Sequence, residues 1–359
     1  MARLKSLLLP STALTAYGAL AVALFAETWK APTTRVIGSY GDPLTCVWFM
    51  RWFAFSLTRG LNPFLTDYVN YPQGYNLMWN TPMPLAGWIL APATLAGGPV
   101  LTYNIVITAC LALSAFAAFL VFSRYVKHPL AAAVGGLVYG FSPYMVIQAV
   151  GHWHVIMAFT PPLMLLLLDE IVVRDRRSPV KLGVLLGLVS VVQLLLGEEI
   201  LASEVLVAAV GVLILAVLHR HQVRARLGRV IRALAVAALV ALPLAAYPLW
   251  VQFSGPNRIT GVIQPRNFYV TDLLNFVVPT DFQWLAPQPA LAISNQFTGN
   301  GSEWNGYLGA PLLLVAIFVA VRYRREALVQ FMALLGLAMA VLSLGSRLHI
   351  GGRDTPVRL

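Results

Sequence analysis

Five ionisable side chains stand where long apolar runs of the sequence meet polar segments. They are Asp42 in GSYGDPLTCVWFMRWF, His152 and His154 in GHWH, and Glu198 and Glu199 at the end of SVVQLLLGEE. Carboxylates and imidazoles are the groups that most often transfer protons in active sites. Because a carboxylate within or beside a membrane is costly, it indicates a functional role by default. We therefore predict that the three acids are catalytic and that the two histidines bind substrate.

Each of these residues also has a simpler interpretation, which the sequence leaves open. Asp42 fits a Gly-Asp-Pro turn. The glutamates fit a solvated helix end that stabilises the start of the next helix. Adjacent helical residues point about 100° apart, so we expect only one glutamate to face a shared site. In an extended segment the two histidines share one side, where they could bind phosphate, an acceptor or a metal, but they also fit a Trp-His belt at headgroup level.

The composition predicts the elements that must position these side chains. Hydrophobic residues make up 58% of the chain and charged residues 11%, against roughly 25% charged in soluble domains. Runs of about 20 apolar residues can cross a hydrocarbon core about 30 Å thick, so we expect an all-α polytopic membrane bundle. The net charge of +11 is attributed to cytoplasmic loops rather than to nucleic-acid binding. Cys46 and Cys110 form no disulfide or metal pattern.

Charge decides which apolar segments cross the membrane. The segments are 6–26, 84–101, 103–123, 129–149, 155–172, 180–197, 200–218, 230–252, 306–321 and 327–344. The second is short and rich in proline, which breaks helices. If it does not cross and the N-terminus is cytoplasmic, most Lys and Arg fall in short inner loops, as the positive-inside rule requires. We therefore predict nine spans, with residues 82–99 as a re-entrant or surface-lying helix on the outer face.

This topology divides the chain into regions with different roles. We expect a first transmembrane helix at 1–26, an outer loop at 27–102, a transmembrane bundle at 103–252, a second outer loop at 253–305, two final transmembrane helices at 306–344 and a truncated outer tail at 345–359. Loops carry sites on a rigid scaffold, so the two long outer loops predict work on the outer face. The sequence contains no nucleotide-binding fingerprint and no clear internal repeat.

The order of these features resembles a known superfamily. One helix followed by a long outer loop with an early acid and surface helices is typical of the GT-C glycosyltransferases. The phrases GSYGDPLTCVWFMRWF, NPFLTDYVNYPQGYNLMW, YGFSPYMVIQAVGHWHVIMAFTPPLMLLLLDE and QLLLGEEIL resemble bacterial membrane proteins grouped with it. The resemblance implies a polyprenyl-phosphate sugar donor, with Asp42 at the catalytic centre as base or metal ligand. The chain lacks a D-x-D or D-E pair there, so a divalent metal stays open as a cofactor.

Inverting sugar transfer defines what the other residues would do. A base takes the proton of the acceptor hydroxyl, and donors or cations hold the departing phosphate. Arg258 and Arg266 suit phosphate by their planar guanidinium groups, although lipid headgroups are the commoner partners. Glu303 could bind a sugar hydroxyl, and Asp67 could bind substrate or cap a turn. Tryptophans, among them Trp52 and Trp153, could stack on sugars or anchor at headgroups.

The predicted partners are the bilayer of the inner or plasma membrane, the lipid-linked donor and a glycan, lipid or protein acceptor. The alternative function is a transporter or flippase for lipid-linked sugars, which would favour charges in mid-span positions. Most carboxylates lie at outer helix ends and Glu204 is the main exception, so the enzyme is favoured. A non-catalytic partner in polymer assembly is a third reading.

Overall fold

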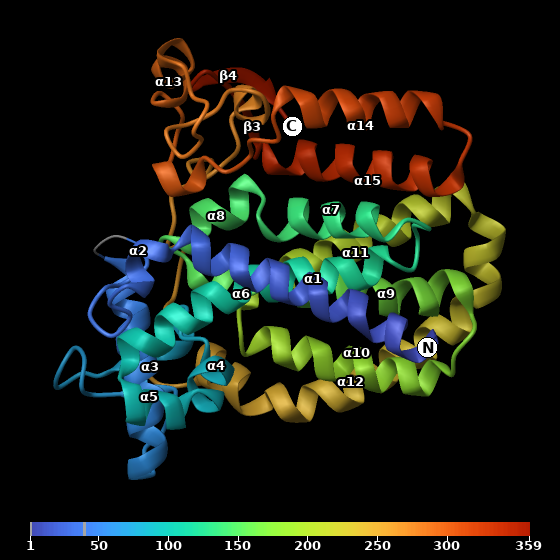
Figure 1. Cartoon of the computed structure of the whole chain (residues 1–359). Coiled ribbons are helices and arrows are strands. Elements are labelled where there is room, and N and C mark those ends of the chain that lie inside the picture. The colour runs from blue at the N-terminus through green and yellow to red at the C-terminus, as the bar shows by residue number, and fades with distance from the viewer. Residues whose placement is uncertain (1, 39–40) are drawn as a thin grey trace. The chain divides into compact units, whose positions relative to one another are not determined.

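The computed structural model describes residues 2–38 and 41–359, which are mostly helical. The chain forms two compact units (Figure 1). The first contains Met1–Glu204 and Ala225–Thr260, and the second contains Val205–Arg224 and Gly261–Leu359. The chain therefore leaves the first unit within one long helix and returns to it within the next.

The first unit holds the helices and strands that surround the predicted site. They are α1 (Ala2–Leu24), α2 (Ala26–Trp29), α3 (Asp42–Arg59), β1 (Leu65–Thr66), β2 (Tyr75–Asn76), η1 (Leu77–Trp79), α4 (Pro84–Ile89), α5 (Ala91–Gly97), α6 (Pro99–Phe122), α7 (Pro129–Gly140), α8 (Pro143–Ala149), η2 (Trp153–Val155), α9 (Thr160–Asp169), η3 (Glu170–Arg174) and α10 (Pro179–Leu194). Two long helices, α11 (Glu198–Leu218) and α12 (Arg220–Ser254), contribute residues to both units.

The second unit combines two apolar helices with irregular chain and a hairpin. Its elements are η4 (Leu273–Phe276), α13 (Gln288–Ser294), η5 (Gly301–Glu303), α14 (Ala310–Arg322), α15 (Ala327–Ser343), β3 (Arg347–Ile350) and β4 (Arg353–Arg358). The buried Asp272 ties η4 to the turn of this hairpin, because its carboxylate accepts from Gly351 N (3.0 Å) and Gly352 N (2.7 Å). The expected all-α fold thus needs correction, since β1 pairs with β2 and β3 with β4, both antiparallel. Strands as short as β1 and β2 have no period that a sequence could reveal.

Several helices are long and apolar enough to cross a membrane. Four pass by length and composition, and α7 with α8 forms a fifth candidate bent by 43°. Four more apolar helices are shorter, at Leu9–Leu24, Pro179–Leu194, Ala310–Arg322 and Ala327–Ser343. Large apolar side chains such as Leu239 (74% exposed) and Val217 (75%) point outward, as they would toward lipid. The chain therefore has the character of a helical membrane protein, while the count of nine spans stays a prediction.

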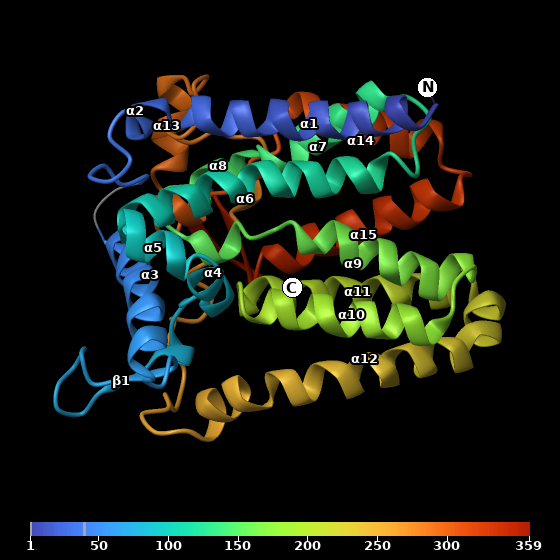
Figure 2. The same cartoon turned by 60° about the horizontal axis from the view of Figure 1, so that its bottom comes forward.

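Small residues let the helices of the first unit approach closely. A Cβ on Gly140 of α7 would lie 2.5 Å from the backbone of Ala115 in α6, and one on Gly187 of α10 would lie 2.7 Å from Ala237 O in α12. Figures 1 and 2 show α10 beside α12. Both glycines belong to pairs four residues apart, with Gly136 and Gly183, which is the spacing that brings membrane helices together.

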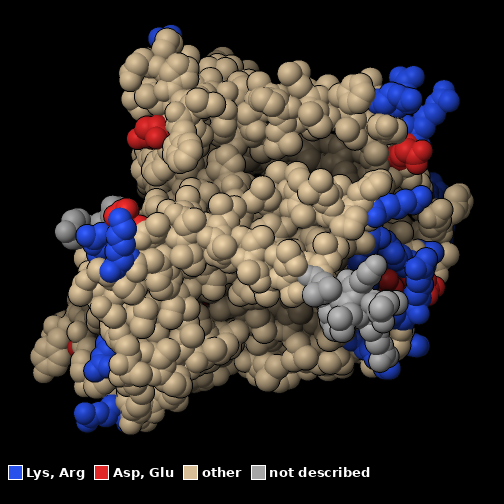
Figure 3. All heavy atoms as spheres, in the orientation of Figure 1, with Lys and Arg blue, Asp and Glu red and all other residues tan. Residues whose placement is uncertain are grey.

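One end of the first unit is basic. Arg174 pairs with Asp169 and covers the ring of Tyr125, which joins the α9 end to the loop after α6. From the start of α12, Arg226 donates to Val172 O (2.9 Å) and Arg229 pairs with Asp175 (2.6 Å). Figure 3 shows Lys and Arg gathered where these segments meet. Arg226 and Arg229 donate hydrogen bonds to backbone carbonyls at the C-terminal end of a helix. The helix dipole also favours positive charge at that end.

We expect Gly140→Ala to lower the stability of the first unit. The added Cβ must displace the α6 backbone, and overpacking of this kind costs about 1–3 kcal/mol. Thermal unfolding of the purified chain in detergent measures the effect. Gly18→Ala in α1 is the matched control, because no atom lies within 4 Å of its Cβ position, and there we expect no loss. Equal melting temperatures for the two variants would contradict the packing described here.

Candidate functional site

A buried asparagine holds the chain that leads to Asp42. Asn104 of α6 is fully buried, and its Oδ1 accepts from Ile37 N (3.0 Å). Its Nδ2 donates to the carbonyls of Pro32 (2.9 Å) and Arg35 (2.7 Å). The Asn104 side chain thus supplies hydrogen-bond partners to the irregular backbone before α3, which has none from a helix or a sheet. This anchor fixes where residues 32–37 lie against α6.

Asp42 begins α3 and is not an isolated turn residue. Gly41 takes φ 107°, which favours glycine, and Pro43 occupies the first turn, where its missing N–H has no cost. A carboxylate at this place is stabilised by the helix dipole. Gly38 lies so close to Val150 that a Cβ would meet its carbonyl at 2.2 Å. The start of α3 is thus packed against the segment that carries the histidines.

Trp153 locks the histidine segment into the core. Its side chain is fully buried, its Nε1 donates to Thr81 O (2.8 Å), and its ring stacks on Phe49 of α3 at 6.3 Å between centroids. Because Trp153 is fully buried, both interpretations of it, as a headgroup anchor and as a ring that stacks on a sugar, are wrong. Because Trp153 stands between His152 and His154, its burial fixes the backbone of both, and their rings lie 6.0 Å apart.

The histidines each meet one of the predicted catalytic carboxylates. His152 Nε2 lies 3.3 Å from Asp42 Oδ2, and His154 Nε2 lies 3.5 Å from Glu199 Oε2. The imidazole side chains are 20% and 11% exposed, whereas the carboxylates are 69% and 68% exposed. Mostly buried rings, each with an exposed carboxylate beside it, suit proton transfer to a ligand arriving from solvent. We call these four residues the paired cluster.

Glu198 and Glu199 separate as adjacent helical residues must. Glu198 is half-buried and its Oε2 accepts from Gln252 Nε2 of α12 (2.6 Å), whereas Glu199 reaches His154. Gly197 explains how the start of α11 comes so near, because a Cβ there would lie 2.3 Å from His154 O. Glu198 therefore braces the cluster against α12 and is not one of its exposed acids.

Two glutamines that contact the site, Gln148 and Gln252, were not predicted from the sequence. Gln148 Oε1 lies 2.5 Å from His152 Nδ1 and orients that ring, while Gln252 holds Glu198. The signal that was overlooked is an amide side chain within an apolar run, as in MVIQAV. One turn after Asp42, burial raises the pKa of the Cys46 thiol, with the Asp42 carboxylate adding to the effect. This thiol therefore stays protonated and is no nucleophile.

The remaining predicted residues lie elsewhere. Asp67 lines a separate cavity, whose wall on α3 is Trp52, ten residues or about 15 Å along the helix from Asp42. The exposed Arg258 donates to Phe253 O (3.3 Å) at the end of α12. Arg266 and Glu303 belong to the second unit, so their part in the same site stays a prediction. Across residues 2–38 and 41–359, no three His, Cys, Asp or Glu side chains are grouped to hold a metal ion.

One protein-family model matches nearly the whole of this chain. The model of a domain of unknown function, DUF6311, matches residues 13–356, and the chain therefore belongs to that family. Neither the curated proteins nor the solved structures contain a match to it.

We expect Asn104→Ala to release the segment before Asp42. The substitution leaves Ile37 N and the carbonyls of Pro32 and Arg35 without their partner, at a cost of about 3 kcal/mol. Thermal unfolding measures this loss, with the exposed Asn295→Ala as the control. A wild-type melting temperature for Asn104→Ala would show that water replaces these bonds.

Proposed function

We propose that this family member is a membrane glycosyltransferase that moves a sugar from a polyprenyl-phosphate donor to an acceptor on the outer face of the membrane. The observation that carries the proposal is the 3.3 Å approach of His152 to Asp42 at the start of α3. An exposed carboxylate with a mostly buried imidazole behind it is an arrangement suited to a general base.

In the proposed reaction, Asp42 takes the proton of an acceptor hydroxyl. The hydroxyl oxygen then forms a bond to the anomeric carbon of the donor sugar as the bond from that carbon to the phosphate oxygen breaks. The electron pair of the broken bond leaves with the phosphate, whose growing negative charge is stabilised by nearby N–H donors. His152 orients Asp42, and His154 in the same way orients Glu199, the second exposed carboxylate of the cluster.

The membrane frame of this proposal has nine spans and a cytoplasmic N-terminus. Four long helices, one bent pair and four shorter apolar helices support that number. The basic end of the first unit favours a cytoplasmic position by the positive-inside rule, which leaves the paired cluster outside. The two short helices α4 and α5 support a re-entrant or surface-lying role for residues 82–99. The membrane would be the inner or plasma membrane.

A second candidate function is transport of a lipid-linked sugar. Glu204 favours it, because this carboxylate lies within the apolar helix α11 and its Oε2 is buried without a hydrogen-bond partner. Its Oε1 accepts from Thr160 Oγ1 at 3.3 Å. Ionisable groups inside membrane helices often mark the path of a substrate or proton.

We expect Asp42→Asn to lower sugar transfer by at least about 10²-fold, because the amide cannot accept the proton. The assay uses the purified chain in liposomes with a panel of polyprenyl-phosphate sugars and a radiolabelled sugar. Glu27→Gln is the matched control, since Glu27 is exposed and pairs with Lys30 and Arg35 rather than with either histidine.

Equal product from wild type and Asp42→Asn would remove Asp42 as the base. Movement of labelled lipid across the bilayer without any transfer would favour the transporter, and Glu204→Gln would then be the variant expected to stop it.

Labelling of introduced cysteines tests the orientation. Cys46 and Cys110 are buried and give a silent background. In intact cells, we expect a membrane-impermeant maleimide to modify Thr33→Cys but not Lys127→Cys, which should react only after permeabilisation. A reporter fused after residue 126 should likewise be cytoplasmic. Labelling of Lys127→Cys in intact cells would overturn the nine-span topology.

A further inference from the structure

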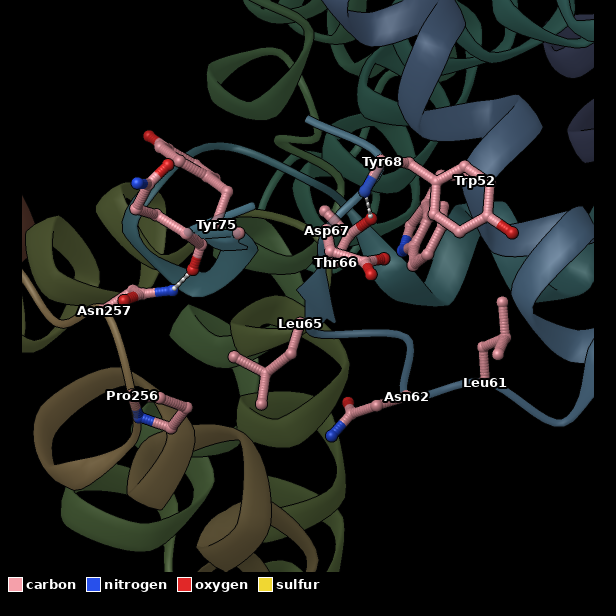
Figure 4. Close-up of a pocket in the computed structure, with 12 residues that line it drawn as sticks. Trp52, Leu61, Asn62, Leu65, Thr66, Asp67, Tyr68, Tyr75, Pro256 and Asn257 are labelled. Atoms are coloured by element: carbon pink, nitrogen blue, oxygen red, sulfur yellow. Dashed lines mark hydrogen bonds between the residues drawn. The ribbon is translucent and has the colours of Figure 1, made fainter. Parts of the chain in front are cut away.

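An open cavity of about 320 Å³ lies between the hairpin of β1 and β2 and the end of α12 (Figure 4). Its walls include Trp52, Asn62, Asp67, Tyr68, Tyr75 and Asn257, all of which belong to the first unit. The volume is at the lower end of the range for small-molecule sites. The cavity is therefore large enough for a small ligand and separate from the paired cluster.

Long-range hydrogen bonds give the cavity fixed walls. The last carbonyls of a helix have no partner within it, and here the first loop supplies them. The buried Asn76 donates to Val251 O (2.7 Å) and Pro256 O (2.9 Å), and Trp79 Nε1 donates to Gln252 O (2.6 Å). Asn257 Nδ2 donates in turn to Gln73 O (2.8 Å). A ligand would enter a site that is already ordered, which lowers the entropic cost of binding.

The exposed ring of Tyr68 lies at this cavity and is held by two neighbouring aromatic rings. Tyr68 is 64% exposed, and its ring centroid lies 5.6 Å from Trp52 and 5.4 Å from Phe55. Figure 4 shows Tyr68 and Trp52 side by side among the residues that line the cavity. An exposed tyrosine fixed by two buried or half-buried rings offers a rigid apolar surface with a polar tip.

The polar lining selects a neutral ligand. The amides of Asn62 and Asn257 each donate one N–H within the protein, to Tyr247 Oη (2.6 Å) and Gln73 O (2.8 Å), so each has a second N–H to offer a ligand, and the Asp67 carboxylate can accept a hydrogen bond. Among the described residues that line the cavity there is no Lys, Arg or His, so a phosphate would meet the Asp67 carboxylate without a cation to balance it. Sugars present both C–H faces, which pack on aromatic rings, and hydroxyls, which bond to amides and carboxylates.

We propose that this cavity binds a neutral saccharide that forms part of the acceptor. Trp52 follows Asp42 by ten residues on α3, which places it about 15 Å along the helix from the catalytic carboxylate. The cavity is therefore suited to an acceptor unit away from the reacting hydroxyl. The assignment to an acceptor rests on the proposed function, whereas saccharide binding itself rests on the cavity alone.

Binding of trisaccharides to the full chain in nanodiscs tests this proposal. We expect saturation-transfer NMR and calorimetry to detect at least one of maltotriose, mannotriose and chitotriose. Tyr68→Ala should weaken binding by up to about tenfold, whereas Tyr68→Phe, which keeps the ring, should bind as wild type does. Tyr71→Ala is the matched control, because Tyr71 is 80% exposed on the same hairpin but does not line the cavity.

The absence of binding by all three sugars, or equal binding by wild type and Tyr68→Ala, would overturn the proposal. Asp42→Asn should bind the sugars normally, because it is remote from the cavity. Tyr68-dependent binding without any sugar transfer would support the cavity and count against the glycosyltransferase. Transfer with an unchanged acceptor KM in Tyr68→Ala would support the enzyme and reject the cavity.

Discussion

The structure of the first unit depends on how its irregular backbone segments, which lie beside apolar helices, obtain hydrogen-bond partners. An unpaired buried backbone group costs about 1–3 kcal/mol, and a membrane offers no water to replace the partner. Asn104 meets this demand for the segment before α3, and Asn76 meets it at the end of α12. Two buried amides thus join irregular segments to helices far away in the sequence, so a long segment between helices can be ordered without a core of its own.

The candidate site follows from these anchors. Hydrogen bonds from Asn104 fix the position of residues 32–37. The next residue, Gly38, packs against the backbone of Val150, two residues before the first histidine. Gly197 brings the start of α11 against His154 from another direction. Two close backbone approaches therefore converge on one short segment, whose core is the buried Trp153. The rings are held in place while the carboxylates stay exposed, an arrangement that would suit the proton transfer proposed above.

Some of this arrangement could be predicted from sequence and some could not. Composition and charge predicted apolar helices, and candidate acids and histidines were recognised because each stands where an apolar run meets a polar segment. Which acid meets which histidine was beyond reach, because it depends on glycine contacts between segments more than 40 residues apart. The β1–β2 hairpin was missed since its strands have two residues each and owe their place to Asn76. The cavity was invisible because Gln73 and Asn257 meet only in the folded chain.

Helix α3 links the two sites by acting as a rigid spacer. The paired cluster lies at its first turn, and the cavity is lined by Trp52 and by the loop that follows its end. In the proposed reaction, an acceptor held at both places would be longer than a single sugar, because about 15 Å separates them along the helix. Binding energy from a remote unit can hold the reacting hydroxyl near Asp42 and so lower the barrier to transfer. The spacing then favours a chain-like acceptor over a lone monosaccharide.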